Sequence, residues 1–229
     1  MCGRYSLTLK GVKIENELDE VAIELKRFKP RYNVAPGQEA PVIRLEDGHR
    51  RVATLRWGLI PGWARDARIA FQCVNARSET VASKPAFRSA FQRRRCLVPA
   101  DGFYEWKAAG SAKQPWRFTR PDEGLMEFAG LWERWTPPEG GSPVETFTVC
   151  TTTPNAVTGR IHDRMPVILD SSGAAAWLNP ETPPKALALL LKPAPDDVLK
   201  AYPVSTVVSN ARNDVQECVL PIPEALELL

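Results

Sequence analysis

Proline is the residue that most constrains how this chain can fold. It occurs 21 times among 229 residues, about twice the usual frequency of about 5 %. Each proline fixes its own φ, removes a backbone donor and interrupts helices. We therefore expect turns, extended loops and short strands to outnumber long helices. At 44 % hydrophobic residues, a chain of this length can still bury a large core without disulfides or metal.

The spacing of apolar residues predicts a small set of helices and many strands. Residues 11–28 have helical spacing with charges on the opposite face, and residues 41–46 and 50–58 flank the turn sequence EDGH as a hairpin would. Strand-like runs rich in aromatic and β-branched residues cover residues 95–106, 115–119, 125–135, 145–153 and 165–170. Further helices are expected at residues 171–178, 183–192 and 195–202, and residues 206–209 are expected to return to the sheet.

These strands come in blocks along the sequence and do not alternate with helices. Such an order favours an α+β fold over a doubly wound parallel sheet. We expect a mainly antiparallel, barrel-like sheet with flanking helices. With no repeat and no convincing linker, residues 1–229 are expected to form a single domain.

Charge and cysteine usage exclude several classes of protein. The net charge of +3 is too small to indicate a nucleic-acid partner, and the arginine run at 93–95 is expected to be a solvated surface. Five scattered cysteines without a CxxC pair, beside two histidines, argue against a zinc site, so we expect no metal and no cofactor. No signal peptide or apolar span is apparent, which predicts a cytoplasmic protein with reduced thiols and no membrane partner.

Four reactive side-chain types occur in polar strings that packing alone does not require. The thiol of Cys2 lies in MCGRY, the amide of Asn75 in VNARSET, the carboxyl of Glu105 in ADGFYEW and the imidazole of His162 in IHDRMPV. Each could be an ordinary structural residue. Together they form a set suited to thiol chemistry, as in cysteine peptidases, so a thiol peptidase using Cys2 is one interpretation.

The position of Cys2 indicates a second interpretation. Removal of Met1 would leave Cys2 with an α-amine and a thiol on adjacent carbons, with ordinary pKa values of about 8 and about 8.5. An amine condenses with an aldehyde to an imine, and a neighbouring thiol closes a five-membered thiazolidine on it. An internal cysteine cannot do this because its nitrogen is an amide.

Five strings in order make the chain resemble the SOS response-associated peptidase family, whose members are abasic-site processing proteins. They are CGRY at 2–5, RYNVAPGQ at 31–38, NARSET at 75–80, CLVPADGFYEW at 96–106 and IHDRMPVIL at 161–169. The resemblance implies a sensor of abasic sites in single-stranded DNA, acting in the DNA damage and SOS response. It would cross-link to the aldehyde of the lesion through Cys2.

The resemblance also implies roles for the candidate residues. Asn75 would hold the α-amine of Cys2, Glu105 would move protons during sugar ring opening and imine formation, and His162 would act as a further acid or base. Abasic lyase activity by β-elimination and self-processing peptidase activity are competing outcomes. The residues expected to contact DNA are Arg4, Asn33, Pro36, Trp63, Arg77, Thr151 and Arg164.

The implied partner is single-stranded DNA containing abasic sites, with replication-fork components as further candidates. We expect a monomer, located in the cytoplasm and associated with the nucleoid when it acts on DNA. Two alternatives remain open at this stage: the thiol peptidase, and a non-covalent reader of modified DNA that would tolerate replacement of Cys2.

Overall fold

The computed structural model describes residues 2–8, 20–110 and 112–222 and contains two sheets. Five strands of the larger sheet form a closed ring in the order β3, β4, β10, β9 and β6. The ring closes because β9 pairs with both β6 and β10, and β10 also pairs with β4. The ring strands are β3 (Glu39–Glu46), β4 (His49–Trp57), β6 (Arg95–Ala100), β9 (Met126–Trp135) and β10 (Val144–Thr152). Short strands β5 (Asn75–Arg77), β11 (Met165–Pro166) and β12 (Ile168–Leu169) extend it. This is the expected barrel-like sheet.

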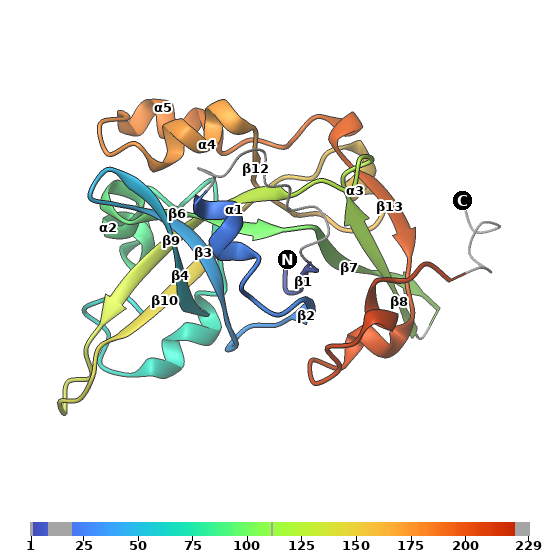
Figure 1. Cartoon of the computed structure of the whole chain (residues 1–229), viewed down its shortest axis with the longest axis horizontal. Helices are drawn as coiled ribbons and strands as arrows, with labels where there is room; N and C mark the ends of the chain where they lie inside the picture. Colours follow the sequence, from blue (N-terminus) through green and yellow to red (C-terminus); the bar gives the residue numbers. More distant parts are fainter. Residues whose placement is uncertain (1, 9–19, 111, 223–229) are drawn as a thin grey trace.

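A second sheet carries the N-terminal cysteine and packs against the ring. Its order is β13-β8-β7-β1-β2 and every pairing in it is antiparallel. The strands are β1 (Tyr5–Leu7), β2 (Arg31–Val34), β7 (Gly102–Ala109), β8 (Ala112–Thr119) and β13 (Lys200–Pro203). Figure 1 shows β7, β8 and β13 at the opposite end of the molecule from the hairpin of β9 and β10.

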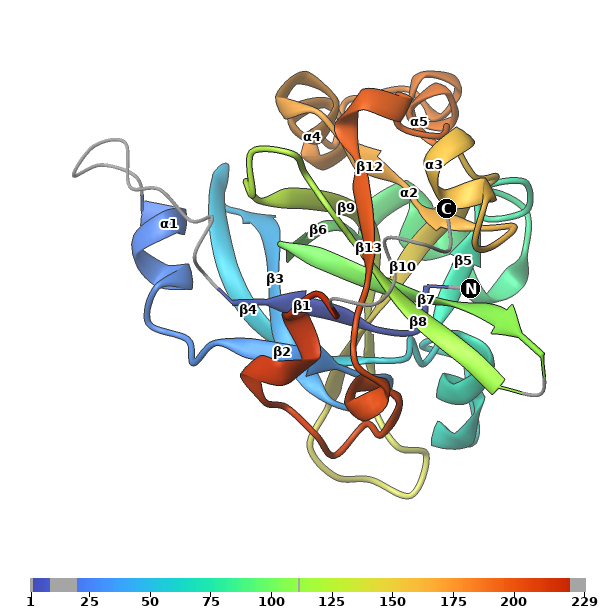
Figure 2. The ribbon, with the colours of Figure 1, turned by 90° about the vertical axis from the view of Figure 1, so that its right-hand side faces the viewer.

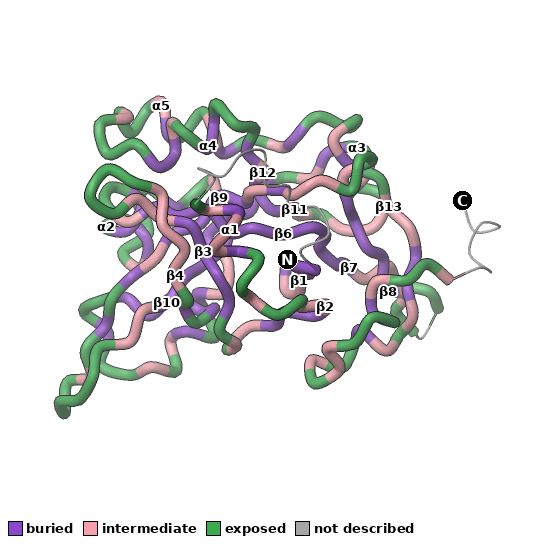
Figure 3. Tube along the Cα trace, viewed as in Figure 1, coloured by how far each residue is buried: buried purple, intermediate pink, exposed green. Residues whose placement is uncertain are grey.

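The core lies between the two sheets and is rich in aromatic rings. Tyr5 of β1 packs on Trp57 at a centroid distance of 5.2 Å, and Phe103 of β7 packs edge-on against Phe128 of β9 at 6.0 Å. All four side chains are almost fully buried, and the burial colours of Figure 3 follow the strands of both sheets. Aromatic contacts of this kind add specific geometry to ordinary apolar burial.

Helices cover the outside of the ring. They are α2 (Pro85–Arg93), α4 (Ser171–Leu178) and α5 (Pro184–Leu190), with α1 (Glu20–Leu25) beside β4 and α3 (Ala156–Gly159) before β11. Figures 1 and 2 show α4 and α5 together along one side of the ring. Trp177 of α4 is fully buried and donates from Nε1 to the carbonyls of Cys96 and Gly130, which fixes α4 on β6 and β9.

Local sequence explains where several elements begin and turn. Asp170 accepts a hydrogen bond from the backbone of Gly173 and caps α4, while a proline occupies the first turn of α2. Between β3 and β4, Asp47 and Gly48 have φ values of 49° and 80°, as a tight two-residue hairpin turn requires. The predicted hairpin and the helices at 171–178 and 183–192 are confirmed.

Other predictions of secondary structure were wrong or lie outside the described residues. The expected helix at 195–202 is a short 3₁₀ turn, η2 (Asp196–Val198), followed by strand β13, and residues 206–209 form the 3₁₀ turn η3 (Thr206–Ser209) instead of a strand. Of the helix expected at 11–28, Glu20–Leu25 is helical and residues 11–19 lie outside the described residues. Helix α2 and the 3₁₀ turns η1 (Ala67–Gln72) and η4 (Gln216–Val219) were not predicted.

The arginine run at 93–95 is not wholly a solvated surface. Arg95 is buried, and its guanidinium donates to the carbonyls of Phe91, Gln92, Trp177 and Asn179. It therefore satisfies carbonyl groups at the C-terminal ends of α2 and α4, which would otherwise lack partners. Within residues 2–8, 20–110 and 112–222, every helix is too short or too polar to span a bilayer.

Candidate active site

Strand β1 places Cys2 inside the protein, beside strand β7. Tyr5 pairs with Phe103 and Ser6 with Gly102 in antiparallel register, which directs the residues before Tyr5 along the part of β7 that contains Glu105. The Cys2 side chain is completely buried. Burial raises the pKa of its thiol, the nearby charge of Glu105 raises it further, and the Arg4 backbone N–H opposes both. The thiol is therefore protonated at neutral pH.

Glu105 is a buried carboxyl group at the centre of the candidate site. Its residue is only 3 % exposed and lies in the buried first half of β7, between Tyr104 and Trp106 in the sequence. Burial raises its pKa from 4.5 to about 8, and the charge of Asp163 adds to this increase. A carboxyl group with a pKa near neutrality can both donate and accept a proton, which suits general acid–base catalysis.

His162 faces Glu105 from the loop after α3. Its Nε2 lies 3.7 Å from Oε2 of Glu105, and its Nδ1 accepts a hydrogen bond from the backbone N–H of Arg164 at 3.0 Å. Burial lowers the pKa of His162, although the exposed carboxylate of Asp163, 3.0 Å from Nδ1, opposes the decrease. The ring is therefore neutral at pH 7, with its proton on Nε2 toward Glu105.

The candidate residue Asn75 is the first residue of strand β5. This strand pairs in parallel with β10, where Asn75 is opposite Val149 and Arg77 is opposite Thr151. The Nδ2 atom of Asn75 is buried and makes no hydrogen bond within the described part of the chain. Because a buried donor without an acceptor is unfavourable, such a group is often explained by a ligand that the site binds.

Arg164 and Thr151 form a second polar cluster with Glu79. Arg164 donates from Nη1 and Nη2 to the two carboxylate oxygens of Glu79, at 2.6 and 3.1 Å, and from Nη2 to the Thr151 carbonyl at 2.7 Å. Thr151 is buried, whereas Arg77 on the adjacent strand is exposed. Hydrogen bonding to Arg164 lowers the pKa of Glu79, so this pair is ionic at neutral pH.

Arg4 and Asn33 are held by the C-terminal part of the chain. Arg4 donates to Oδ1 of Asn33 at 2.8 Å and to the Val208 carbonyl at 2.7 Å. Asn33 is fully buried, and its Nδ2 atom lies within hydrogen-bond distance of the carbonyls of Val208, Asn210 and Asn213. These contacts hold β1 and β2 to the segment after β13, and a role of either residue in binding DNA stays a prediction.

Pro36 and Trp63 lie in surface turns. Pro36 is half-buried in the turn between β2 and β3. Trp63 is 61 % exposed in the turn before η1, where it lines an open groove of about 560 Å³ with neighbouring residues that include Arg65 and Arg68. An exposed indole can stack on a nucleic-acid base, and contact of these two residues with DNA stays a prediction.

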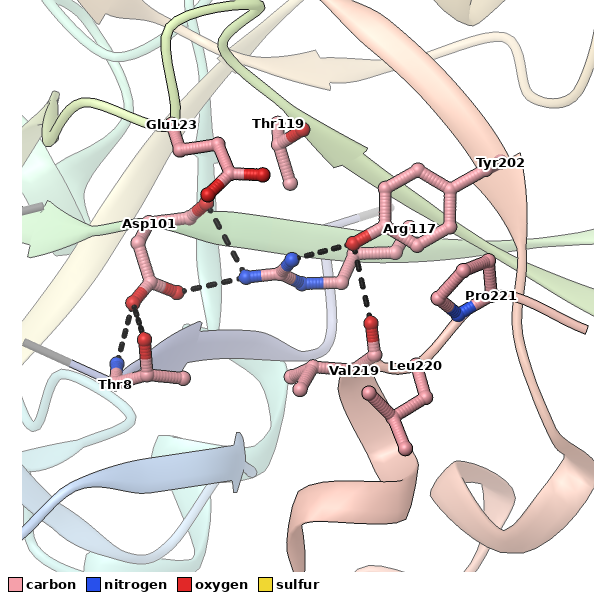
Figure 4. A pocket seen from close by; sticks show the side chains of 9 residues that line it. All are labelled: Thr8, Asp101, Arg117, Thr119, Glu123, Tyr202, Val219, Leu220 and Pro221. Atoms are coloured by element: carbon pink, nitrogen blue, oxygen red, sulfur yellow. Dashed lines mark hydrogen bonds and ion pairs between the residues drawn. The ribbon is translucent and has the colours of Figure 1, made fainter. Parts of the chain in front are cut away.

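A polar pocket of about 180 Å³ lies at the other end of β1 (Figure 4). Asp101 accepts hydrogen bonds from the backbone N–H and the hydroxyl of Thr8, and forms a buried ion pair with Arg117 at 2.9 Å. Arg117 also donates to the Tyr202 hydroxyl, which donates to the Val219 carbonyl. This network anchors β1 to β7, β8 and β13. The sequence analysis missed it because its residues are scattered through unrelated strings.

The structure thus brings Cys2, Glu105 and His162 together and places Asn75 and Thr151 on paired strands. Glu79 and Asp163 occur in the same sequence strings as the candidate residues, but their contacts with Arg164 and His162 could not be predicted from those strings. Among the described residues, no group of three or more His, Cys, Asp or Glu side chains could hold a metal ion.

Comparison with known proteins assigns the chain to a family. The profile of the family described as SOS response associated peptidase (SRAP) matches residues 1–211. The chain belongs to this family. It is 42 % identical over 223 residues to the abasic site processing protein YoqW of Bacillus subtilis (strain 168), covering 96 % of this chain and 99 % of that protein. It is also 34 % identical to the abasic site processing protein HMCES of Gallus gallus, covering 86 % of this chain and 67 % of that protein.

A solved crystal structure has a fold similar to that of this chain. The crystal structure of a protein from Bacteroides thetaiotaomicron matches with a TM-score of 0.84 at 30 % identity, covering 96 % of this chain and all of that one. The resemblance inferred from the five sequence strings is therefore confirmed as family membership, and the α+β class with a barrel-like sheet is confirmed as well.

Proposed function

We propose that this protein captures abasic sites in single-stranded DNA by forming a thiazolidine through Cys2 after removal of Met1. The product would be a covalent DNA–protein cross-link that shields the lesion in the DNA damage and SOS response. Two kinds of observation support the proposal. Relatives over nearly the whole chain are named abasic site processing proteins, and a buried thiol lies beside a carboxyl group whose pKa is about 8.

The proposed reaction balances with the loss of one water molecule. Glu105, protonated near neutral pH, donates a proton to the ring oxygen while the anomeric hydroxyl releases its proton to solvent, and the abasic sugar opens to its aldehyde. The α-amine of Cys2 then adds to the aldehyde carbon, and loss of the hydroxyl as water gives the imine. The thiol sulfur attacks the imine carbon, its proton passes to the nitrogen, and the five-membered ring closes. The neutral His162 assists proton transfer from its position 3.7 Å from Glu105.

Asn75 has a separate role in this proposal. The α-amine must be held as a free base with its lone pair directed at the aldehyde. The amide of Asn75 has an oxygen that can accept from this amine and a buried Nδ2 that makes no hydrogen bond within the described residues. Nδ2 would donate to an oxygen of the bound sugar or its phosphate. This buried donor is the observation at Asn75 that favours a bound sugar or phosphate oxygen at this position.

The raised pKa of the Cys2 thiol favours this chemistry over a general thiol peptidase. A cysteine peptidase attacks with a thiolate, which requires a lowered pKa, whereas burial and the charge of Glu105 both raise that of Cys2. In the proposed order the amine attacks first, so a protonated thiol suffices. Lyase activity by β-elimination from the imine, and peptidase activity limited to self-processing, are side outcomes of the same site.

The proposed DNA interface surrounds this site. Arg77 and Arg164 would contact phosphates, Thr151 would line the pocket, and Trp63 would stack on a base beside the lesion. Arg4, Asn33 and Pro36 belong to the proposed interface as well, although the first two also have the structural contacts described above. Single-stranded DNA with abasic sites is the proposed partner of a monomeric, cytoplasmic protein that joins the nucleoid, and replication-fork components are further proposed partners.

The experiment is an adduct assay with wild type and three variant forms of the protein. Single-stranded DNA containing one uracil is treated with uracil glycosylase, incubated with protein, and resolved under denaturing conditions. We expect a heat-stable adduct with wild type and none with Cys2→Ala, whereas the control Cys73→Ala, at another buried thiol, retains it. A third form with one additional residue before Cys2 keeps the thiol but blocks the amine.

The blocked form makes the test decisive. If it gives a full yield of heat-stable adduct, the amine is not required and the thiazolidine is wrong. If no form gives an adduct but wild type cleaves a peptide, the thiol peptidase is correct. Binding without any covalent product, unchanged in Cys2→Ala, would instead indicate a non-covalent reader. Intact mass shows directly whether Met1 has been removed.

A further inference from the structure

We propose that Glu79 occupies the phosphate-binding face of Arg164 and thereby reduces the affinity of the protein for DNA that lacks a lesion. The inference rests on the proposed function, which assigns Arg164 to phosphate binding, because Glu79 would compete with DNA phosphate for that arginine. Glu79 would act as an internal substitute for a phosphate group, which an incoming strand has to displace. It is therefore a specificity-determining residue.

The hydrogen bonds of Arg164 leave little of its guanidinium for a ligand. Of its five N–H groups, three donate to Glu79 and the Thr151 carbonyl. The Nε atom is buried and makes no hydrogen bond within the described residues. One N–H on Nη1 remains. A phosphate binds arginine best through two parallel hydrogen bonds, so a bidentate phosphate contact requires Glu79 to leave.

Exposure indicates which partner would move. The Arg164 side chain is 12 % exposed and is held by the Thr151 carbonyl of the buried strand β10, whereas the Glu79 side chain is 49 % exposed. Glu79 therefore covers the outer side of a fixed cation and can swing into solvent without opening the core. Carboxylate and phosphate offer the same pair of oxygens to the guanidinium fork, which makes the exchange geometrically direct.

The neighbouring charges strengthen the inference. Glu79 lies in the same string as the site residue Asn75 and the exposed Arg77, two residues beyond the end of strand β5. A phosphate that approaches Arg164 would meet a full negative charge at its guanidinium, because Glu79 is ionised through its hydrogen bonds to Arg164. DNA without a lesion forms no covalent bond with Cys2 that could offset this repulsion, whereas a covalently captured strand does.

The test measures equilibrium binding, which does not depend on cross-linking. A labelled single-stranded oligonucleotide without a lesion is titrated with full-length wild type, Glu79→Gln and the control Glu46→Gln. Glu46 also pairs with an arginine on the surface, its side chain is 44 % exposed, and it lies on β3 at the hairpin turn. The control therefore changes the net charge by the same amount at a different place.

We expect Glu79→Gln to bind about five- to tenfold more tightly at low salt, as one additional charged contact predicts. The gain should shrink about 2.6-fold between about 50 and 200 mM salt, because one more phosphate contact steepens the salt dependence for single strands by about 0.7. Glu46→Gln should change affinity by less than about twofold. Glu79→Gln combined with Arg164→Ala should lose the gain, with thermal unfolding used to verify that each variant is folded.

The outcomes separate the two hypotheses. Equal or weaker binding by Glu79→Gln, or an equal gain in Glu46→Gln, overturns this inference and leaves the proposed function standing. A gain that persists without Arg164 also overturns it, since the effect would not pass through that guanidinium. If neither wild type nor Glu79→Gln binds this lesion-free oligonucleotide, the inference is wrong, whereas the proposed function is decided separately by the adduct assay with abasic DNA.

Discussion

Replacing Glu105 by glutamine should stabilise the protein at neutral pH while removing its proposed catalytic proton transfer. The carboxyl group is buried, and its pKa rises from 4.5 to about 8 on folding. Between these two values the folded protein binds one more proton than the unfolded chain. Stability therefore falls as the pH rises through this window. Glutamine has nearly the same shape but stays neutral, so the variant should not lose stability in this way.

The size of the effect follows from the same two values. At pH 7 the unfolded carboxyl is ionised, and the roughly 2.5 pH units above 4.5 correspond to about 3 kcal/mol of unfolding free energy. At pH 4 both forms are largely protonated, and the difference between wild type and Glu105→Gln should fall to a few tenths of a kcal/mol. The gain at pH 7 is large compared with a typical total stability of about 5–15 kcal/mol.

Urea unfolding at pH 4, 5.5 and 7 provides the assay. The midpoint of Glu105→Gln should move progressively above that of wild type as the pH rises, with an unchanged m-value. The control Glu46→Gln removes an exposed carboxylate and should stay within about 0.5 kcal/mol of wild type at every pH. If Glu105→Gln is less stable than wild type at pH 7 by about 1 kcal/mol or more, Glu105 is ionised and paired in the folded protein. The assignment of a neutral carboxyl acid would then be refuted.

Two further substitutions test how the site is supported. Arg117→Met should lower the unfolding free energy by about 3–5 kcal/mol, because it leaves Asp101 buried without its ion-pair partner. In urea unfolding, the double variant with Asp101→Asn should recover much of this loss. If the double variant recovers nothing, the ion pair is not the cause of the loss. Gly130→Ala should lower the unfolding free energy of the protein by about 1–3 kcal/mol, since its Cβ would lie 2.9 Å from Cys96 Sγ and from Val98 Cγ2. A thermal midpoint equal to that of wild type would show that strands β6 and β9 can move apart locally.

Much of the fold was predictable because its strands have local signatures. The hairpin of β3 and β4 has both alternating apolar residues and a turn that favours positive φ, and α4 has a capping aspartate. By contrast, Lys200–Pro203 becomes a strand only because β8 offers an edge to it. Its sequence alone has the apolar spacing of a helix. The strand conformation of Lys200–Pro203 depends on pairing with β8, more than 80 residues earlier in the chain. The local sequence pattern cannot predict such a pairing.

At the candidate site, the sequence indicates residue types but not the contacts they make. Residue types suited to thiol and proton-transfer chemistry were evident from the sequence, but not which of them carry internal hydrogen bonds. Asn33 was expected to contact DNA, and the structure gives its amide three backbone carbonyls and the guanidinium of Arg4. The roles of the candidate residues, and the single catalytic and DNA-binding domain over residues 1–229, stay predictions.

The internal contacts of strand β1 explain how Cys2 can be held in a fixed position. The strand has only three residues, too few for its ladder alone to fix it firmly. Polar contacts fasten it at both ends: Arg4 to Asn33 and Val208 before it, and Thr8 to the buried pair of Asp101 and Arg117 after it. A buried ion pair adds little net stability, but it tolerates few alternative arrangements. We therefore infer that these two clusters fix the register of β1 on β7, and hence the position of Cys2 relative to Glu105.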